Sequence, residues 1–141
     1  MHEVMAKVGP AATDEQRMDR FLEAYREAWA DPASGRLADL WARDGKMMHP
    51  EFTEPIVGRD AVMDYLRRML ELAPDLTVRP LAAAASGDTV FIHFQGEGTF
   101  AGKKIVWEGV DRYDLDGDVA VYGIGFFDPG PVRNALGVDS S

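Results

Sequence analysis

Residues 89–115 read TVFIHFQGEGTFAGKKIVWEGVDRYDL, and this stretch decides the fold. Apolar and polar side chains alternate through both halves, which predicts two long strands joined by a tight turn at residues 101–102. In the second strand the odd positions from 105 to 115 are nearly all apolar, while the even positions hold most of the charge. Alternate side chains of a strand point to opposite faces, so the odd face is expected to pack inward. Asp111 stands in the middle of that face.

Asp111 is therefore the first candidate for chemistry. An unpaired carboxylate is costly to bury or has its pKa shifted upward, so it enters an apolar layer only with a partner or a purpose. The functional interpretation is an acid that transfers protons in a pocket. The alternative is a structural carboxylate that binds a buried tyrosine or tryptophan donor.

The first half of the chain is predicted to be mainly helical. Thr13 and Gln16 have the spacing of a capping box, and the apolar spacing that follows predicts a helix to about residue 30. The rest of the first half is expected to form a short helix after residues 34–35, a turn at 44–45, a brief strand over 46–50, a loop over 51–58 and a helix over 59–73. In the second half, further strands are expected over 76–85 and 119–127, followed by a short turn or helix through 136–137.

Helices followed by a run of antiparallel strands indicate an α+β fold. Gly96 and Gly98, both on the expected inner face of the first long strand, would let the sheet bend sharply. We therefore expect a cone-shaped α+β barrel in which the N-terminal helices pack on a curved antiparallel sheet.

The composition of the 141 residues is that of one globular domain, with 46% hydrophobic residues. We expect a single domain over residues 13–137, a flexible leader over 1–12 and a tail over 138–141. The formal net charge of −9 repels phosphate backbones and anionic lipids, so neither nucleic acid nor a membrane is an expected partner. The chain has no cysteine, which excludes disulfides and thiol chemistry, and the default compartment is the cytoplasm.

Four features together resemble the nuclear transport factor 2-like superfamily: Tyr25, the segment LWARD at residues 40–44, His49 before Pro50, and the Gly-Arg pair at residues 58–59. That superfamily includes ketosteroid isomerases and SnoaL-type polyketide cyclases. The resemblance covers nearly the whole chain and implies the cone fold. Because one fold serves many chemistries, it implies the activity less specifically.

The resemblance to ketosteroid isomerases implies roles for three residues. Tyr25 matches a tyrosine that helps hold an enolate oxygen, and His49 matches a general base that is aspartate in those enzymes. Their second oxyanion donor, an aspartic acid, matches Gly109 here, and Asp111 lies two residues further on the same face. The chain thus departs from the isomerase pattern at two of three positions. In this superfamily the outer sheet face often packs on a second subunit, which implies a homodimer.

Aromatic residues are expected to line the cone together with these polar groups. The predicted pocket residues are Trp29, Trp41, Phe94, Trp107, Tyr122 and Phe126. Glu51 and Glu54 flank a loop that could close the cone, with solvated loop acids as the simpler interpretation. No spacing of ligands indicates a metal site, and no glycine-rich loop indicates a nucleotide cofactor, so none is expected.

These residues predict a cofactor-independent enzyme for a cyclic or polycyclic ketone or a similar apolar metabolite. The chemistry would be isomerisation or aldol-type ring closure, with Asp111 and His49 sharing the acid and base roles and Tyr25 donating a hydrogen bond to the oxyanion. An epoxide hydrolase-like enzyme is an alternative, since limonene epoxide hydrolase shares the fold, although no inward arginine is evident. The contrasting alternative is a non-catalytic binding protein for a hydrophobic small molecule.

Overall fold

The computed structural model describes residues 13–137, which form three α-helices, two 3-10 helices and six strands. The predictions for residues 1–12 and 138–141 lie outside the described residues. The α-helices are α2 (Asp14–Ala30), α3 (Arg59–Leu72) and α4 (Gly130–Ala135), and the 3-10 helices are η1 (Pro32–Ser34) and η2 (Arg36–Leu40). The strands are β1 (Trp41–Met48), β2 (Ile56–Val57), β3 (Thr77–Ser86), β4 (Thr89–Phe100), β5 (Lys103–Asp116) and β6 (Val119–Phe127).

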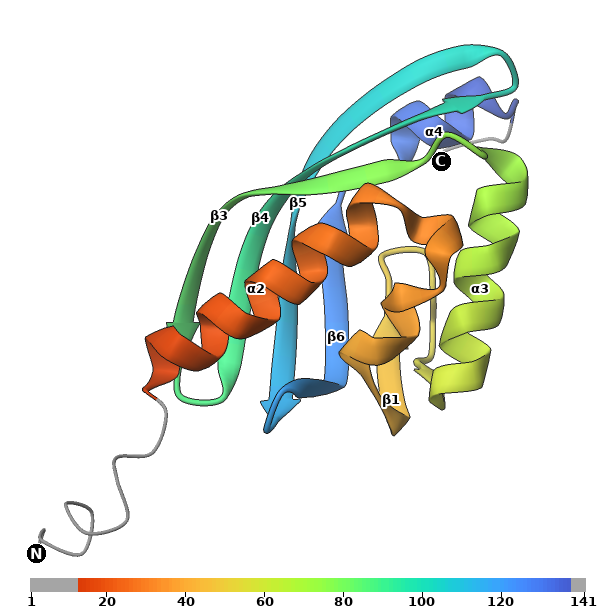
Figure 1. Ribbon diagram of the computed structural model, residues 1–141. Coiled ribbons are helices and arrows are strands. Elements are labelled where there is room, and N and C mark those ends of the chain that lie inside the picture. Colours follow the sequence, from red (N-terminus) through yellow and green to blue (C-terminus); the bar gives the residue numbers. More distant parts are fainter. Residues whose placement is uncertain (1–12, 138–141) are drawn as a thin grey trace, which may run out of the picture.

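The six strands form one sheet in the order β2-β1-β6-β5-β4-β3. All neighbouring strands are antiparallel except β1 and β6, which are parallel. The sheet curves around α2, and α3 stands beside it on the same side (Figure 1). The predicted α+β class and the packing of helices on a curved, mostly antiparallel sheet are confirmed.

The first helix begins where its sequence predicts. Gln16 donates its backbone N–H to Thr13 Oγ1, and Thr13 donates its N–H to the Gln16 side chain, which completes the capping box. One face of the helix buries Phe21, Tyr25 and Ala28 against the sheet. The helix therefore delivers the Tyr25 hydroxyl to the inner face of the strands.

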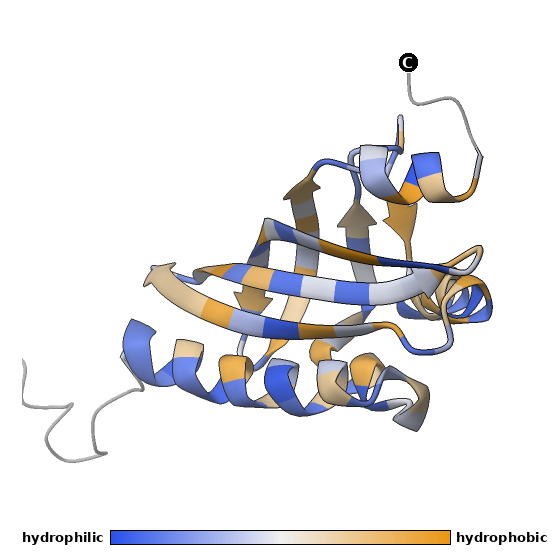
Figure 2. Cartoon of the chain, turned by 90° about the horizontal axis from the view of Figure 1, so that it is seen from above, coloured by the Kyte–Doolittle hydropathy of each residue, from blue (hydrophilic) through white to orange (hydrophobic). Residues whose placement is uncertain are grey.

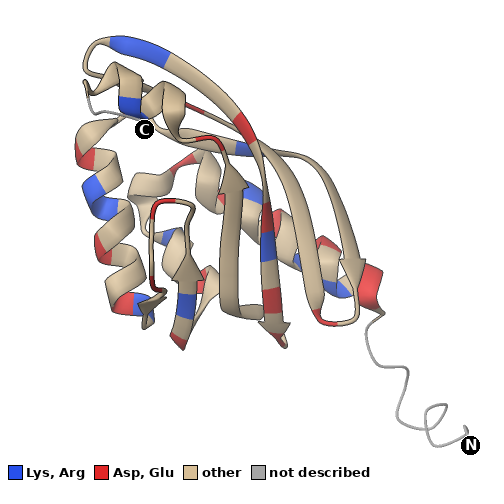
Figure 3. Ribbon diagram, turned by 180° about the vertical axis from the view of Figure 1, so that it is seen from behind, with Lys and Arg blue, Asp and Glu red and all other residues tan. Residues whose placement is uncertain are grey.

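The hairpin of β4 and β5 has the predicted turn and faces. Even positions of β4 are buried throughout, and the paired odd positions of β5 share that inner side. Hydrophobic and hydrophilic residues alternate along these strands in Figure 2. Charged residues of both signs mark β5 when the molecule is seen from behind in Figure 3. The inner face of this hairpin carries Phe94, Asp111 and Tyr113.

β3 contains Pro80 and accommodates it by its place in the sheet. It is an edge strand of the sheet, and its pairing with β4 is shifted between Pro80 and Ala82. Proline lacks the N–H that a central strand would need, so an edge position with an irregularity accommodates it.

Three local predictions in the first half are wrong. Residues 44–45 do not turn the chain but lie inside β1, which runs from Trp41 rather than from residue 46. The pairing of β1 with β6 is irregular between Trp41 and Lys46, and an added Cβ at Gly45 would lie 3.1 Å from the Trp41 ring. The expected loop over 51–58 contains the short strand β2. The predicted short helix after residues 34–35 is present, as the 3-10 helix η2.

The short helix α4 closes the end of the chain against the long strands. Ala135 is buried in a small cluster with Phe100, Ala73 and Leu76. No helix within residues 13–137 is long and apolar enough to cross a membrane.

Candidate functional site

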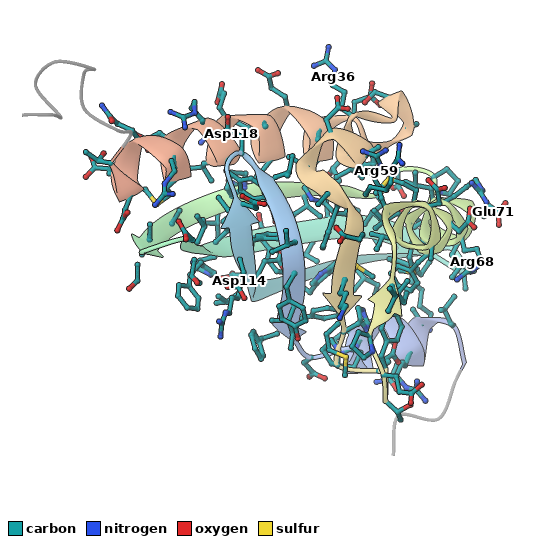
Figure 4. All side chains as sticks on the ribbon, turned by 90° about the horizontal axis from the view of Figure 1, so that it is seen from below. Arg36, Arg59, Arg68, Glu71, Asp114 and Asp118 are labelled. Atoms are coloured by element: carbon teal, nitrogen blue, oxygen red, sulfur yellow. The ribbon has the colours of Figure 1, made fainter. Side chains whose placement is uncertain are left out.

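A cavity of about 130 Å³ lies between the inner face of the sheet and helices α2 and α3. Its walls are mostly apolar and aromatic. The ionisable groups among the residues that line it are Asp111, His49 and three tyrosines, Tyr25, Tyr65 and Tyr113. The labelled side chains Arg68 and Glu71 of α3 point away from the sheet in Figure 4. These two charges of α3 therefore face solvent. The polar side-chain groups of the cavity come from a few residues only.

Asp111 lies on the inner face of β5 and holds two tyrosine hydroxyls with one oxygen. Tyr25 donates to Oδ2 at 2.9 Å, and Tyr113 donates to the same atom at 3.1 Å. The other oxygen, Oδ1, receives no hydrogen bond from the part of the chain that the structure describes. No fully buried side-chain N or O atom there lacks a partner, so Oδ1 is accessible from the cavity.

Burial raises the pKa of Asp111 from about 3.8 to about 7, although the hydrogen bonds from Tyr25 and then Tyr113 oppose that rise. A group with this pKa exchanges its proton readily at neutral pH. Burial, reinforced by the charge of Asp111, also raises the pKa of Tyr25 and Tyr113 well above 10. Both tyrosines therefore stay protonated and remain hydrogen-bond donors.

His49 lies at the same cavity, directly after β1. Its Nδ1 accepts the backbone N–H of Glu51 at 3.2 Å, and its ring lies against Phe52, Tyr65 and Phe127. Burial lowers the pKa of His49, while the nearby charge of Glu51 partly opposes this. The neutral imidazole that results carries its proton on Nε2, because Nδ1 is the acceptor.

Glycines on the inner sheet face set the shape of the cavity. An added Cβ would lie 2.6 Å from the Trp107 ring at Gly96, 2.8 Å from the Phe94 ring at Gly109, and 2.6 Å from the Trp41 ring at Gly123. Aromatic rings thus occupy the space that these glycines leave.

Gly125 differs from these glycines, because the nearest atom to an added Cβ would be Asp111 Oδ1, at 3.0 Å. The next nearest atoms belong to the Phe127 ring, at 3.6 Å or more. The missing side chain of Gly125 therefore leaves space directly beside the accessible carboxylate oxygen.

The structure brings the three predicted polar residues to one cavity. Tyr25, His49 and Asp111 all line it, as do four of the predicted aromatic residues: Trp29, Trp41, Phe94 and Trp107. Tyr25 contacts Asp111 directly, whereas no hydrogen bond or ion pair within residues 13–137 joins His49 to Asp111.

The placement of Tyr122 and Phe126 in the pocket is wrong. Tyr122 pairs with Asp114 and Phe126 with Val110, and both partners lie on the outer side of β5. Phe126 is accordingly 53% exposed. The inner positions of β6 pair with the inner positions of β5, so Phe127 lines the cavity in place of Phe126.

Tyr113, Tyr65 and Phe127 line the cavity but were not predicted as site residues. Tyr113 had a signal in the sequence, because it lies two residues after Asp111 and so shares its strand face. Tyr65 shares the three- and four-residue spacing of the apolar residues of α3, which is the signal that could have placed it on the inner side of that helix. Phe127 had no usable signal, since the glycines beside it carry no side chain to mark the inner face.

The two loop acids have different surroundings. Glu51 accepts a hydrogen bond from Arg133 at 2.6 Å, while its backbone N–H binds His49. Glu54 is exposed and does not line the cavity. No arginine is among the cavity-lining residues of the described chain, and no group of three or more His, Asp or Glu residues suited to a metal ion occurs there.

The sequence of the chain matches a known protein family. The model of the SnoaL-like domain matches residues 22–122. No curated protein matches the chain at a significant level. Many solved structures match it, and all those compared below are under 20% identical, so they establish the fold alone.

Three solved structures illustrate that likeness. A hypothetical protein with a ketosteroid isomerase-like fold from Catenulispora acidiphila, in complex with trimethylamine, is 18% identical with a TM-score of 0.75, covering 85% of this chain and 94% of that chain. A proposed SnoaL-like polyketide cyclase from Jannaschia is 15% identical with a TM-score of 0.77, covering 93% and 99%. TerC co-crystallized with polyporic acid is 13% identical with a TM-score of 0.75, covering 86% and 98%.

Proposed function

The chain belongs to the SnoaL-like domain family, and from this premise we propose that it is a cofactor-independent acid–base enzyme for a small cyclic carbonyl compound. One observation carries the proposal. Asp111, with a pKa of about 7, exposes Oδ1 to an otherwise apolar cavity while two tyrosines hold Oδ2. A carboxyl group that is half ionised near neutral pH can both take and return a proton.

The reaction class follows from the chemistry of that oxygen. Oδ1 of ionised Asp111 takes a proton from the carbon next to a carbonyl, and the electron pair of the C–H bond moves onto the carbonyl oxygen. The protonated carboxyl then returns the proton to carbon, at the same position or at a conjugated one. Return at a conjugated position is isomerisation. If the enolate carbon attacks a second carbonyl instead, a C–C bond forms, the second carbonyl oxygen becomes an alkoxide, and the protonated carboxyl gives its proton to that alkoxide, which completes an aldol ring closure.

His49 is the proposed donor to the developing oxyanion. Its Nε2 carries the proton of the neutral ring, and a neutral donor does not lose its proton to the enolate as readily as a charged one. Tyr25 does not take the oxyanion role that the resemblance implies, because its hydroxyl is bound to Asp111. Its role in the proposal is to tune and orient the carboxylate.

The size of the cavity limits which substrates fit. A closed cavity of roughly 150 Å³ holds one benzene molecule, so about 130 Å³ suits a single ring rather than a fused polycycle. Larger substituents would extend through the open side. The neighbouring protein TerC, co-crystallized with polyporic acid, supports a small-molecule ligand.

Exchange of α-protons tests the proposal without knowledge of the product. Cyclic mono- and diketones are incubated with the protein in D₂O, and NMR follows the loss of the proton signal next to the carbonyl. We expect at least one ketone to exchange faster with the wild type than with Asp111→Asn by about 100-fold. Asp114→Asn, on the outer side of the same strand, is the matched control. Equal rates for wild type and Asp111→Asn with every ketone that binds would reject the proposal.

A second candidate is binding of a small alkylammonium ion without catalysis. The cavity surrounds one carboxylate with aromatic rings, and the faces of aromatic rings attract quaternary ammonium groups. A structural neighbour is in complex with trimethylamine. Calorimetry with tetramethylammonium tests it: binding that Asp111→Asn abolishes, together with no α-proton exchange, would favour this candidate over the enzyme.

We also propose a homodimer formed through the outer face of the sheet. His93, Val110 and Phe126 form one row across β4, β5 and β6 on that face. Phe91 and Val110 are 39% and 37% exposed, and His93 pairs with Glu108 at 2.8 Å. Exposed apolar side chains grouped beside charges are typical of a protein–protein contact.

A further inference from the structure

The C-terminal helix is tied to the loop that carries His49. Arg133 of α4 donates from Nη1 to Glu51 Oε2 at 2.6 Å, and the two side chains are only 30% and 35% exposed. The residues are far apart in sequence, so this ion pair joins the end of the chain to the segment after β1. A partly buried, short Arg–carboxylate contact restrains position more than a fully exposed one does.

The same loop determines the state of the imidazole. Glu51 donates its backbone N–H to His49 Nδ1, and Phe52 donates its N–H to the His49 carbonyl at 2.9 Å. Only an unprotonated Nδ1 can accept the first bond, so the arrangement favours a neutral ring with its proton on Nε2. The arrangement depends on where Glu51 lies.

We propose that Arg133 is a positioning residue for His49: by holding the Glu51 side chain, it keeps the loop in the conformation that leaves His49 neutral with its proton on Nε2. The proposal rests on the proposed function in one respect only: that the Nε2 proton is donated in a hydrogen bond to the substrate oxygen. The positioning itself is a property of the protein alone. It can therefore be measured without a substrate.

The charges around His49 determine the sign of the effect. Glu51 lies on its own loop, Tyr65 faces it from α3 with a pKa of about 12, and Asp111 lines the same cavity from β5. Arg133 balances the charge of Glu51 from α4. Arg68, also on α3, acts on Tyr65.

Loss of the Arg133 side chain has three consequences for the pKa of His49. The Glu51 carboxylate loses its partner, the N–H bond to Nδ1 weakens, and water reaches the ring more easily. Each of these favours the protonated imidazolium. All three therefore raise the pKa of His49.

The experiment is a pH titration of the imidazole nitrogens by ¹⁵N NMR in the full chain. The chain has three histidines, and the signals of His49 are identified as those missing from the spectrum of His49→Gln. We expect wild-type His49 to be the Nε2–H form above its pKa. Arg133→Met, which keeps apolar bulk, is expected to raise that pKa by about half a unit or more and to mix the two tautomers. Arg133→Lys is expected to restore most of the wild-type value.

The matched control is Arg20→Met. Arg20 also forms a long-range ion pair, with Asp118 at 3.0 Å, but its side chain is 51% exposed and Asp118 lies in the turn between β5 and β6 rather than in the loop that carries His49. We expect it to leave His49 unchanged. A His49 pKa and tautomer that are the same in Arg133→Met as in wild type would overturn the proposal.

Glu51→Gln supplies a second test if Arg133→Met does not fold. It weakens the contact with Arg133 and keeps the backbone N–H of residue 51, so the loop should loosen and the two tautomers of His49 should mix, as in Arg133→Met. A His49 that stays entirely in the Nε2–H form would overturn the proposal. The two hypotheses fail separately: loss of α-proton exchange activity in every assay rejects the enzyme, whereas an unresponsive His49 rejects the positioning role.

Discussion

Tyr25 in the first described helix donates its hydroxyl hydrogen to Oδ2 of Asp111 on β5, across 2.9 Å and 86 residues of sequence. Tyr113 donates to the same oxygen. Two donors on one oxygen orient the carboxyl group and leave Oδ1 for the cavity. The pair thus links the packing of α2 on the sheet to the reactivity of the acid.

Removal of either donor should raise the pKa of Asp111 above about 7, because each hydrogen bond stabilises the ionised form. Tyr25→Phe is expected to have the larger effect, since its bond is 2.9 Å against 3.1 Å for Tyr113. The pKa is measured by ¹³C NMR of the carboxyl carbon. Tyr122→Phe, outside the cavity, should change nothing. A pKa that falls in Tyr25→Phe would contradict this account of the site.

Asp111 should also make the stability of the protein depend on pH. Its pKa is raised from about 3.8 to about 7 in the folded state, so the native protein binds more protons than the unfolded chain between these values. The free energy of unfolding therefore contains a contribution that is complete below pH 4 and is lost as pH rises through 7. Its size is about 4 kcal/mol at most.

Denaturant unfolding of wild type and Asp111→Asn at pH 5 and pH 8 measures that contribution. Asparagine does not titrate, so the variant should gain stability relative to the wild type on going from pH 5 to pH 8. The difference in unfolding free energy, variant minus wild type, is therefore expected to be more positive at pH 8 than at pH 5. A difference in unfolding free energy that stays constant across this range would show that the pKa of Asp111 is not raised.

The hairpin of β4 and β5 could be predicted because both strands alternate strictly and a buried face admits only one register. The same alternation singled out Asp111. The start of α2 could be predicted because a capping box is a local signal. Neither prediction needed information from distant parts of the chain.

The inner face of β6 could not be predicted for the opposite reason. Its inner positions include Gly123 and Gly125, which have no side chain, while Tyr122 and Phe126 on the outer face supply the hydrophobic period. A periodicity argument takes the more apolar face as buried. Likewise Asp44 and Gly45 resemble a turn, although the close approach of the Trp41 ring and of two backbone carbonyls favours a glycine inside β1.

Gly125→Ala should block the carboxylate without removing it. An added Cβ would lie 3.0 Å from Asp111 Oδ1, in the space where the substrate carbon would approach. We expect α-proton exchange to fall by roughly tenfold or more, because a misplaced reacting atom loses the benefit of orientation. Gly130→Ala is the matched control, since its Cβ would approach Asp128 Oδ1 at the same 3.0 Å, outside the cavity. Full activity in Gly125→Ala would exclude this approach.

Phe126→Asp tests the proposed dimer. Phe126 is 53% exposed on the outer sheet face, and a charge there would have to be desolvated in any contact between two such faces. Sedimentation velocity should give a dimer for the wild type and a monomer for the variant. Val57→Asp, at a residue that is 60% exposed but lies on the edge strand β2, should remain a dimer. Equal masses for wild type and Phe126→Asp would exclude this face as the interface.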